Sequence, residues 1–241
     1  MQSIGGPFSN AARNLGQLRR SPACWIWFGI VMGIQSAVAI AGGPDRVSAW
    51  FENFGLSGSG FLAGKLWQVF SYSLLHGGWW HAGLNALFVL LIGSRIEHMA
   101  GGRVLTLTLL AGVLGGALGH LLLGSGLRAG MSGGGLALLL LLTTLSPQSR
   151  IFPLPVSGQS LGLGILLAEL LLALIDPALG LPGWSAAGRA LVEHGMSGWF
   201  QMGHACHFGG ALAGWLFGRW LMRSRVTLDH LRRARARREA K

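Results

Sequence analysis

The segment Val104–Leu123 reads VLTLTLLAGVLGGALGHLLL and contains no Asp, Glu, Lys or Arg. A helix rises about 1.5 Å per residue, so this segment reaches roughly 30 Å, the thickness of the bilayer's hydrocarbon core. The composition of the whole chain agrees with a membrane protein. Of its 241 residues, 51% are hydrophobic and only 11% are charged, whereas a soluble domain has about 25% charged residues. This composition argues against an ordinary soluble domain.

Glycine is the second unusual feature of the composition, with 40 residues and no G-X-Y period. The missing period excludes collagen. Membrane helices use glycine where two backbones approach closely, so the glycine content also favours a helical membrane protein.

Six apolar stretches follow one another along the chain, at residues 23–41, 81–96, 104–123, 131–145, 161–175 and 202–222. The fourth and fifth are short, so each extends into its flanks or ends beside a wet cavity inside the protein. The first could be a signal peptide, because basic residues precede it. We interpret it as a retained helix, since five further stretches follow. The prediction is an all-α membrane protein with six transmembrane helices at 22–222, a segment 1–21 before them and a basic tail 223–241.

The placement of charge predicts the orientation. With six spans, the two tails and the even loops hold fifteen Lys and Arg residues and the other side holds four, so both termini are expected in the cytoplasm. Nine of the 19 basic residues lie at 219–241. A nucleic-acid partner is one reading of such a tail. We favour an orientation signal that also attracts anionic lipids, with no nucleic acid.

Two outer connections are long. Residues 42–80 carry several Trp and Phe residues, which predicts structure lying in the membrane interface. Residues 176–201 include a helix-like run at Ala186–Glu193.

Polar side chains inside membrane spans are costly and call for a reason. The ones we single out in the apolar stretches are His81, Asn85, His120, Ser132, Glu169, His204 and His207. Four of them also have a purely structural interpretation: His81 and Asn85 could bond a neighbouring helix, Ser132 could cap a helix, and His207 could bond a carbonyl.

The functional interpretation depends on their combination. His81 and Asn85 are one helical turn apart, Ser132 lies in the glycine-rich stretch 130–135, and His207 precedes glycines 210, 214 and 218. All four groups are expected at similar depth near the outer ends of their spans. A nucleophile, a base and extra donors at one level suit acyl transfer. No Asp or Glu is expected in the outer half of a span, so a Ser–His dyad is predicted.

These motifs resemble the rhomboid family of intramembrane serine proteases. The similar segments are FSYSLLHGGWWHAGLN at 70–85, GMSG at 130–133, RIFPLPV at 150–156 and HFGG at 207–210. G-x-S-G alone is weak evidence, but three motifs in the right order on the second, fourth and sixth spans are strong.

The resemblance implies Ser132 as nucleophile, His207 as base, and an oxyanion site made by His81, Asn85 and the Ser132 backbone N–H. It also implies single-span or other transmembrane proteins as substrates, no cofactor, and a gate formed by the fifth helix and its outer cap. No metal is expected, because the histidines are too dispersed for a set such as H-E-x-x-H. A bacterial inner membrane fits the charge bias and the family.

Three departures from the family pattern affect the site. Cys206 replaces the usual Ala before the histidine, and Leu136 replaces an aromatic that often stacks on the histidine, so the base is expected to be held less firmly. The loop 176–201 is long, which affects the gate.

His204 lies one turn before His207 and is interpreted as a supporting or packing residue. Glu169 is placed in the middle of the fifth span, protonated or bonded to a neighbouring helix. The rival functions are a non-catalytic rhomboid-like protein that binds membrane helices, and a small transporter.

Overall fold

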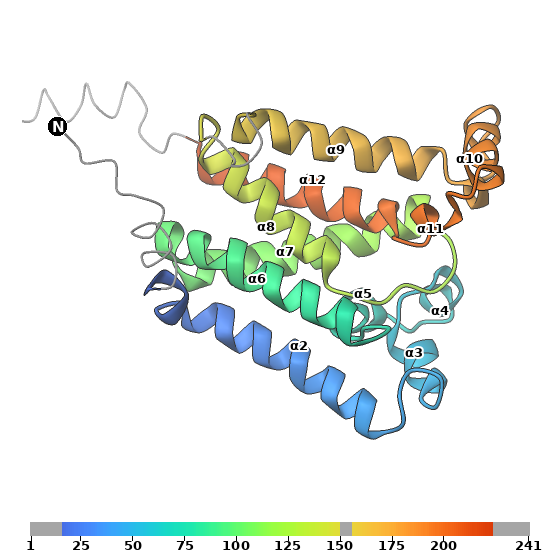
Figure 1. Ribbon diagram of the computed structural model, residues 1–241, viewed down its shortest axis with the longest axis horizontal. Coiled ribbons are helices and arrows are strands. Elements are labelled where there is room, and N and C mark those ends of the chain that lie inside the picture. The colour runs from blue at the N-terminus through green and yellow to red at the C-terminus, as the bar shows by residue number, and fades with distance from the viewer. Residues whose placement is uncertain (1–15, 150–155, 224–241) are drawn as a thin grey trace, which may run out of the picture.

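The computed structural model describes residues 16–149 and 156–223 (Figure 1). Within these ranges the regular elements are all helices, and an isolated β-bridge joins Leu56 and Arg128, so the predicted all-α class is confirmed there. The long helices are α2 (Pro22–Ile40), α6 (Trp79–Ala100), α7 (Gly102–Leu123), α8 (Ser132–Leu145), α9 (Gly158–Leu174) and α12 (His204–Leu221). They coincide with the six predicted apolar stretches to within a few residues.

The two long connections contain short helices. The first holds α3 (Ser48–Phe54), α4 (Gly58–Leu62), α5 (Gln68–Ser71) and the 3-10 turn η1 (Tyr72–Leu74), and the second holds η2 (Pro177–Leu179), α10 (Trp184–Glu193) and α11 (Ser197–Phe200). The predicted helical run at Ala186–Glu193 lies in α10. Figure 1 shows α3, α4, α5, α10 and α11 gathered at one end of the bundle, which we call the site end.

The surface of the bundle is apolar where a soluble protein would be polar. Helices α2 and α7 are long and apolar enough to cross a membrane, each with a mean hydropathy of 1.8, and α8 and α9 are shorter apolar helices. On α7 the exposed residues Leu114, Leu118 and Leu122 recur every four positions, and α9 repeats the pattern from Leu163 to Leu171. Such stripes suit contact with lipid. The count of six spans and the orientation remain predictions, and the tails at 1–15 and 224–241 lie outside the described residues.

Helix α12 runs between α7, α8 and α9, and glycine allows its close approach to them. A Cβ at Gly210 would overlap the Gly133 carbonyl of α8, and one at Gly214 would overlap the backbone of Ala137. Gly218 packs on α8 as well. The glycines at 210, 214 and 218 therefore all face α8, which is the helix that begins at Ser132.

Helix α2 is fixed to α6 through its first turn. The Glu97 carboxylate of α6 accepts hydrogen bonds from the backbone N–H groups of Ala23 and Cys24, at 3.0 and 3.1 Å. These N–H groups have no partner within their own helix, and the Ser21 side chain does not cap them. A side chain from another helix thus caps α2.

Candidate active site

Ser132 is the first residue of α8, and the turn before it fixes its position. Gly130 has φ = +126°, a conformation that favours glycine. The Gly130 N–H donates to the Tyr72 carbonyl at 2.9 Å, and the Met131 N–H donates to His76 Nε2 at 3.3 Å. Two successive backbone groups are therefore held just before the serine.

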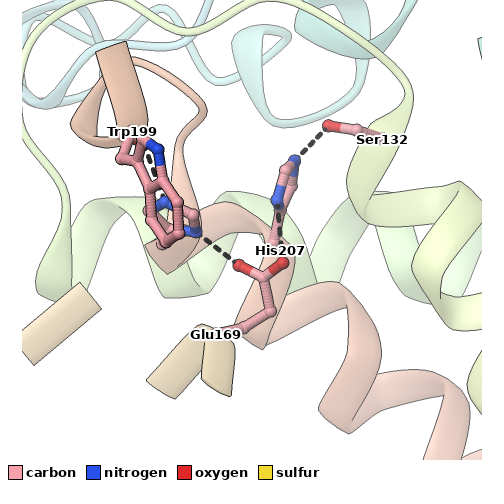
Figure 2. A network of polar contacts seen from close by, with 5 residues as sticks. Ser132, Glu169, Trp199 and His207 are labelled. Carbon is pink, nitrogen blue, oxygen red and sulfur yellow. Dashed lines mark hydrogen bonds and ion pairs between the residues drawn. The ribbon is translucent and has the colours of Figure 1, made fainter. Parts of the chain in front are cut away.

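His207 lies one turn into α12, and its ring faces the start of α8. The distance from His207 Nε2 to Ser132 Oγ is 2.8 Å, a hydrogen bond between side chains 75 positions apart (Figure 2). The close packing of α12 on α8 makes this contact possible. The structure thus brings together the hydroxyl and the imidazole that the sequence singled out.

Glu169 of α9 lies on the other side of the same ring (Figure 2). Its Oε1 is 3.3 Å from His207 Nδ1, and its Oε2 is 2.7 Å from His204 Nδ1. The expectation that no acidic residue reaches the base is therefore wrong. The expectation that the base is held less firmly without an aromatic residue at position 136 stays a prediction, and the Glu169 carboxylate is the group that contacts the imidazole from this side.

The depth of Glu169 explains the error. Helix α9 ends at Leu174, so Glu169 is five residues, about 7.5 Å, from the site end of its helix. His207 is three residues from the start of α12, about 4.5 Å in, and the long glutamate side chain covers the difference. A sequence signal was available, because a carboxyl in an apolar helix needs a partner, and two histidines one turn apart on another span can supply it.

His204 completes the chain of polar contacts. Its ring is buried, with 5% of the side chain exposed, and its Nε2 is 2.8 Å from the Trp199 carbonyl. The interpretation of His204 as a supporting residue agrees with these two contacts.

The other two predicted site residues lie at the same cavity. A cavity of about 740 Å³ is lined by His81 and Asn85 of α6 together with Ser132, Glu169 and His207. The Asn85 side-chain N–H donates to the His81 carbonyl at 2.9 Å. The His81 ring lies over Gly130, where a Cβ would come within 2.7 Å of it. The structure thus gathers all four predicted residues around one space.

His76 is a further supporting residue, and no role was predicted for it from the sequence. It precedes α6, is 1% exposed, and its ring contacts that of His81 edge-on, with centroids 4.9 Å apart. Burial, followed by the neighbouring His81, lowers the pKa of His76 from 6.5 to about 4. The neutral ring can accept from the Met131 N–H and donate to the Leu74 carbonyl, 3.3 Å from Nδ1.

Arg128 ties three segments together at the rim of the cavity. Its backbone pairs with Leu56 in the isolated bridge, at 2.8 and 2.9 Å, and its guanidinium donates to the Gln201 carbonyl at 2.9 Å. The loop before α8 is thereby joined both to the first long connection and to the segment that leads into α12.

Glu169, His204 and His207 also each offer an atom that could bind a metal ion, and these three atoms lie within 4.8 Å of one another. Three hydrogen bonds, together with the 3.3 Å contact between His207 Nδ1 and Glu169 Oε1, already account for the nitrogens of both rings and for both carboxylate oxygens. We therefore do not assign these residues as metal ligands.

The family comparison agrees with this geometry. A family model of the rhomboid domain matches residues 63–224. The chain belongs to the rhomboid family. The resemblance seen in the motifs is thus confirmed, and a search of curated proteins finds none that matches the chain. Rhomboids are integral membrane proteins of a protease family that acts on transmembrane substrates, and the family also includes non-catalytic members. The rhomboid match begins after α2, α3 and α4.

Proposed function

We propose that this rhomboid is an intramembrane serine endopeptidase that cleaves transmembrane segments of other membrane proteins. The observation that carries the proposal is the 2.8 Å contact between Ser132 Oγ and His207 Nε2. A serine bonded to a histidine is the arrangement expected of an activated nucleophile. A transporter would need no such pair.

In the proposed reaction, His207 Nε2 removes the proton from Ser132 Oγ as the oxygen attacks the substrate carbonyl. The C–N bond then breaks, and the same proton passes from Nε2 to the leaving amine. Water enters, gives its proton to His207 and attacks the acyl-enzyme ester. The proton returns to Ser132 Oγ as the new carboxyl end leaves, so the enzyme is unchanged.

The oxyanion would form at the start of α8. The Ser132 backbone N–H is among the first in its helix, which have no intrahelical partner, and His81 and Asn85 line the same cavity. One well-placed donor of this kind contributes about 3–4 kcal/mol. The proposed oxyanion site therefore consists of His81, Asn85 and the Ser132 N–H.

The substrate must present an extended backbone at this point, because a helical peptide bond has its carbonyl occupied. A cavity of about 740 Å³ gives room for an unwound segment and for the water that resolves the acyl-enzyme. We propose single-span or other transmembrane proteins as substrates, and a bacterial inner membrane as the location.

The test uses the full chain reconstituted in liposomes with a panel of single-span substrates. Wild type is expected to cleave at least one of them, while Ser132→Ala and His207→Ala are expected to fall to background. Ser36→Ala in α2, a residue that does not line the cavity, is the matched control and should cleave like wild type. Cleavage that persists in Ser132→Ala excludes this nucleophile. Binding of substrates without cleavage by wild type would favour the non-catalytic alternative.

A further inference from the structure

The structure assigns Glu169 a place beside the proposed Ser132–His207 pair: its carboxylate orients His207, and His204 holds the carboxylate. Glu169 and His204 are thus positioning residues that act through His207. This inference rests on the proposed function and extends the dyad to a Ser–His–Glu array.

The hydrogen-bond roles follow from the atoms that can only accept. The Trp199 carbonyl has no proton to give, so His204 Nε2, 2.8 Å away, donates to it. If His207 Nε2 is to accept the Ser132 proton, the ring's own proton must be on Nδ1. The structure places Glu169 Oε1 3.3 Å from Nδ1, as an acceptor for that proton. The carboxylate thereby selects the tautomer that base catalysis needs.

The remaining contact, between His204 Nδ1 and Glu169 Oε2, is 2.7 Å long and contains one shared proton. Either His204 is an imidazolium beside a carboxylate, or Glu169 carries the proton on Oε2 beside a neutral ring. The pair has no net charge in both cases, which lowers the cost of placing a carboxyl in an apolar helix. In both cases Oε1 is left to accept from His207.

The array also stabilises the positive charge that develops on the His207 ring during the reaction. When Ser132 gives its proton to His207 Nε2, the ring becomes positive while its Nδ1–H stays bonded to Oε1. A neighbouring carboxylate stabilises that imidazolium without itself taking the proton. The 3.3 Å contact is longer than an ordinary charge-assisted bond of about 2.7–2.9 Å, so it is the one expected to shorten as the charge appears.

The contact that holds the His204 ring comes from a separate part of the chain. Trp199 is in α11, outside the long helices, and its carbonyl fixes the His204 ring, which in turn fixes the Glu169 side chain of α9. The orientation of His207 thus depends on three elements, α9, α11 and α12.

The test compares four single variants, and the double variant that combines Glu169→Leu with His204→Leu, by two readouts. Glu169→Leu removes both orientation and charge. Glu169→Gln keeps the shape, because its amide oxygen can accept from His207 while its NH₂ donates to neutral His204. His204→Leu removes the holding contact, and Glu193→Gln, an exposed glutamate on α10, is the matched control. The readouts are the rate at which a fluorophosphonate labels Ser132, and kcat and KM for a transmembrane substrate.

Glu169→Leu is expected to lower both the labelling rate and kcat by on the order of 10³-fold, with KM unchanged. Glu169→Gln should lie between Glu169→Leu and wild type, and Glu193→Gln should match wild type. His204→Leu should also lower kcat, and should have no further effect in the Glu169→Leu background, because it acts through that carboxylate. Thermal unfolding of each variant shows whether it has folded, and the Gln variant, which changes no shape, gives the answer if the Leu variants do not fold.

The outcomes separate this inference from the proposed function. Glu169→Leu and Glu169→Gln variants that label and cleave like wild type overturn the inference and leave the function standing. Labelling of Ser132 in wild type without cleavage of any substrate refutes the endopeptidase, while the labelling rates still test Glu169. A wild type that neither labels nor cleaves overturns both. Stoichiometric Zn²⁺ that is lost in Glu169→Gln also overturns the inference, because a metal on His207 Nδ1 would place the ring proton on Nε2.

Discussion

Gly210 of α12 lies directly against the backbone of Gly133 in α8, so that a Cβ at position 210 would overlap the Gly133 carbonyl. The two glycines adjoin the reacting side chains, since Ser132 precedes Gly133 and His207 is three residues before Gly210. The separation of α8 and α12 at the level of the site is therefore set by a contact between two backbones. Unlike side chains, these backbone atoms cannot move aside by changing rotamer.

The first prediction is that Gly210→Ala destabilises the protein and reduces activity. The added methyl group must push α12 from α8, and such overpacking costs about 1–3 kcal/mol. The displacement also lengthens the contact between Ser132 Oγ and His207 Nε2. Thermal unfolding in detergent and cleavage well below the unfolding temperature should both be impaired.

Gly29→Ala in α2 is the matched control for this substitution, because a Cβ there has nothing within 4 Å. It should melt at or slightly above the wild-type temperature, since alanine has the higher helix propensity. Equal behaviour of the two variants would show that the close approach of α12 to α8 is not needed.

The second prediction concerns pH and His76. Burial lowers the pKa of this histidine from 6.5 to about 4, so the unfolded chain binds a proton more readily than the folded one. The stability that His76 contributes is therefore complete above a pH of 6.5 and is lost as the pH falls toward 4. Protonation would also remove the acceptor for the Met131 N–H just before Ser132.

The measurement is the unfolding temperature of wild type and His76→Gln between these pH values. The glutamine can accept a hydrogen bond but does not titrate in this range, and all other histidines are common to both proteins. The difference between the two curves should shrink with falling pH, because only wild type loses the His76 contribution. Parallel curves would contradict the prediction.

The third prediction is that Glu97→Ala weakens the attachment of α2. The carboxylate caps the first turn of α2 through two backbone N–H groups, and losing a cap costs about 0.5–2 kcal/mol. Glu97→Gln keeps one acceptor oxygen and should lose less. Glu193→Ala, on an exposed residue of α10, should melt like wild type, whereas a Glu97→Ala protein that also melts like wild type would show that this cap is not stabilising.

Much of the fold could be predicted from apolar length alone. The stretch 131–145 became α8 (Ser132–Leu145), and 202–222 became α12 (His204–Leu221), because in a membrane an unbroken apolar run has few alternatives to a helix. The short helices of the first connection were less predictable. Their positions depend on contacts such as the one from Ser71 Oγ to the Phe54 carbonyl, at 2.7 Å, which no periodicity reveals.

The candidate site was predictable where residues share a motif and unpredictable where they do not. Ser132 and His207 each lie beside diagnostic glycines, and the order of the spans placed them at one level. Glu169 has no motif around it, and its contact with His207 depends on how far α9 is offset along its axis relative to α12. That offset is decided by tertiary packing, so the sequence indicated that Glu169 needs a partner, but its contact with His207 became visible only in three dimensions.

The cap that Glu97 places on α2 has a consequence for where the folded domain begins. The rhomboid match begins at residue 63, yet Cys24 and Val31 of α2 are fully buried in the same core as Ala86 and Leu90 of α6. A protein trimmed to the matched segment would leave that side of α6 uncovered and Glu97 without its two donors. We therefore expect the unit that folds to be longer than the segment by which the family is recognised.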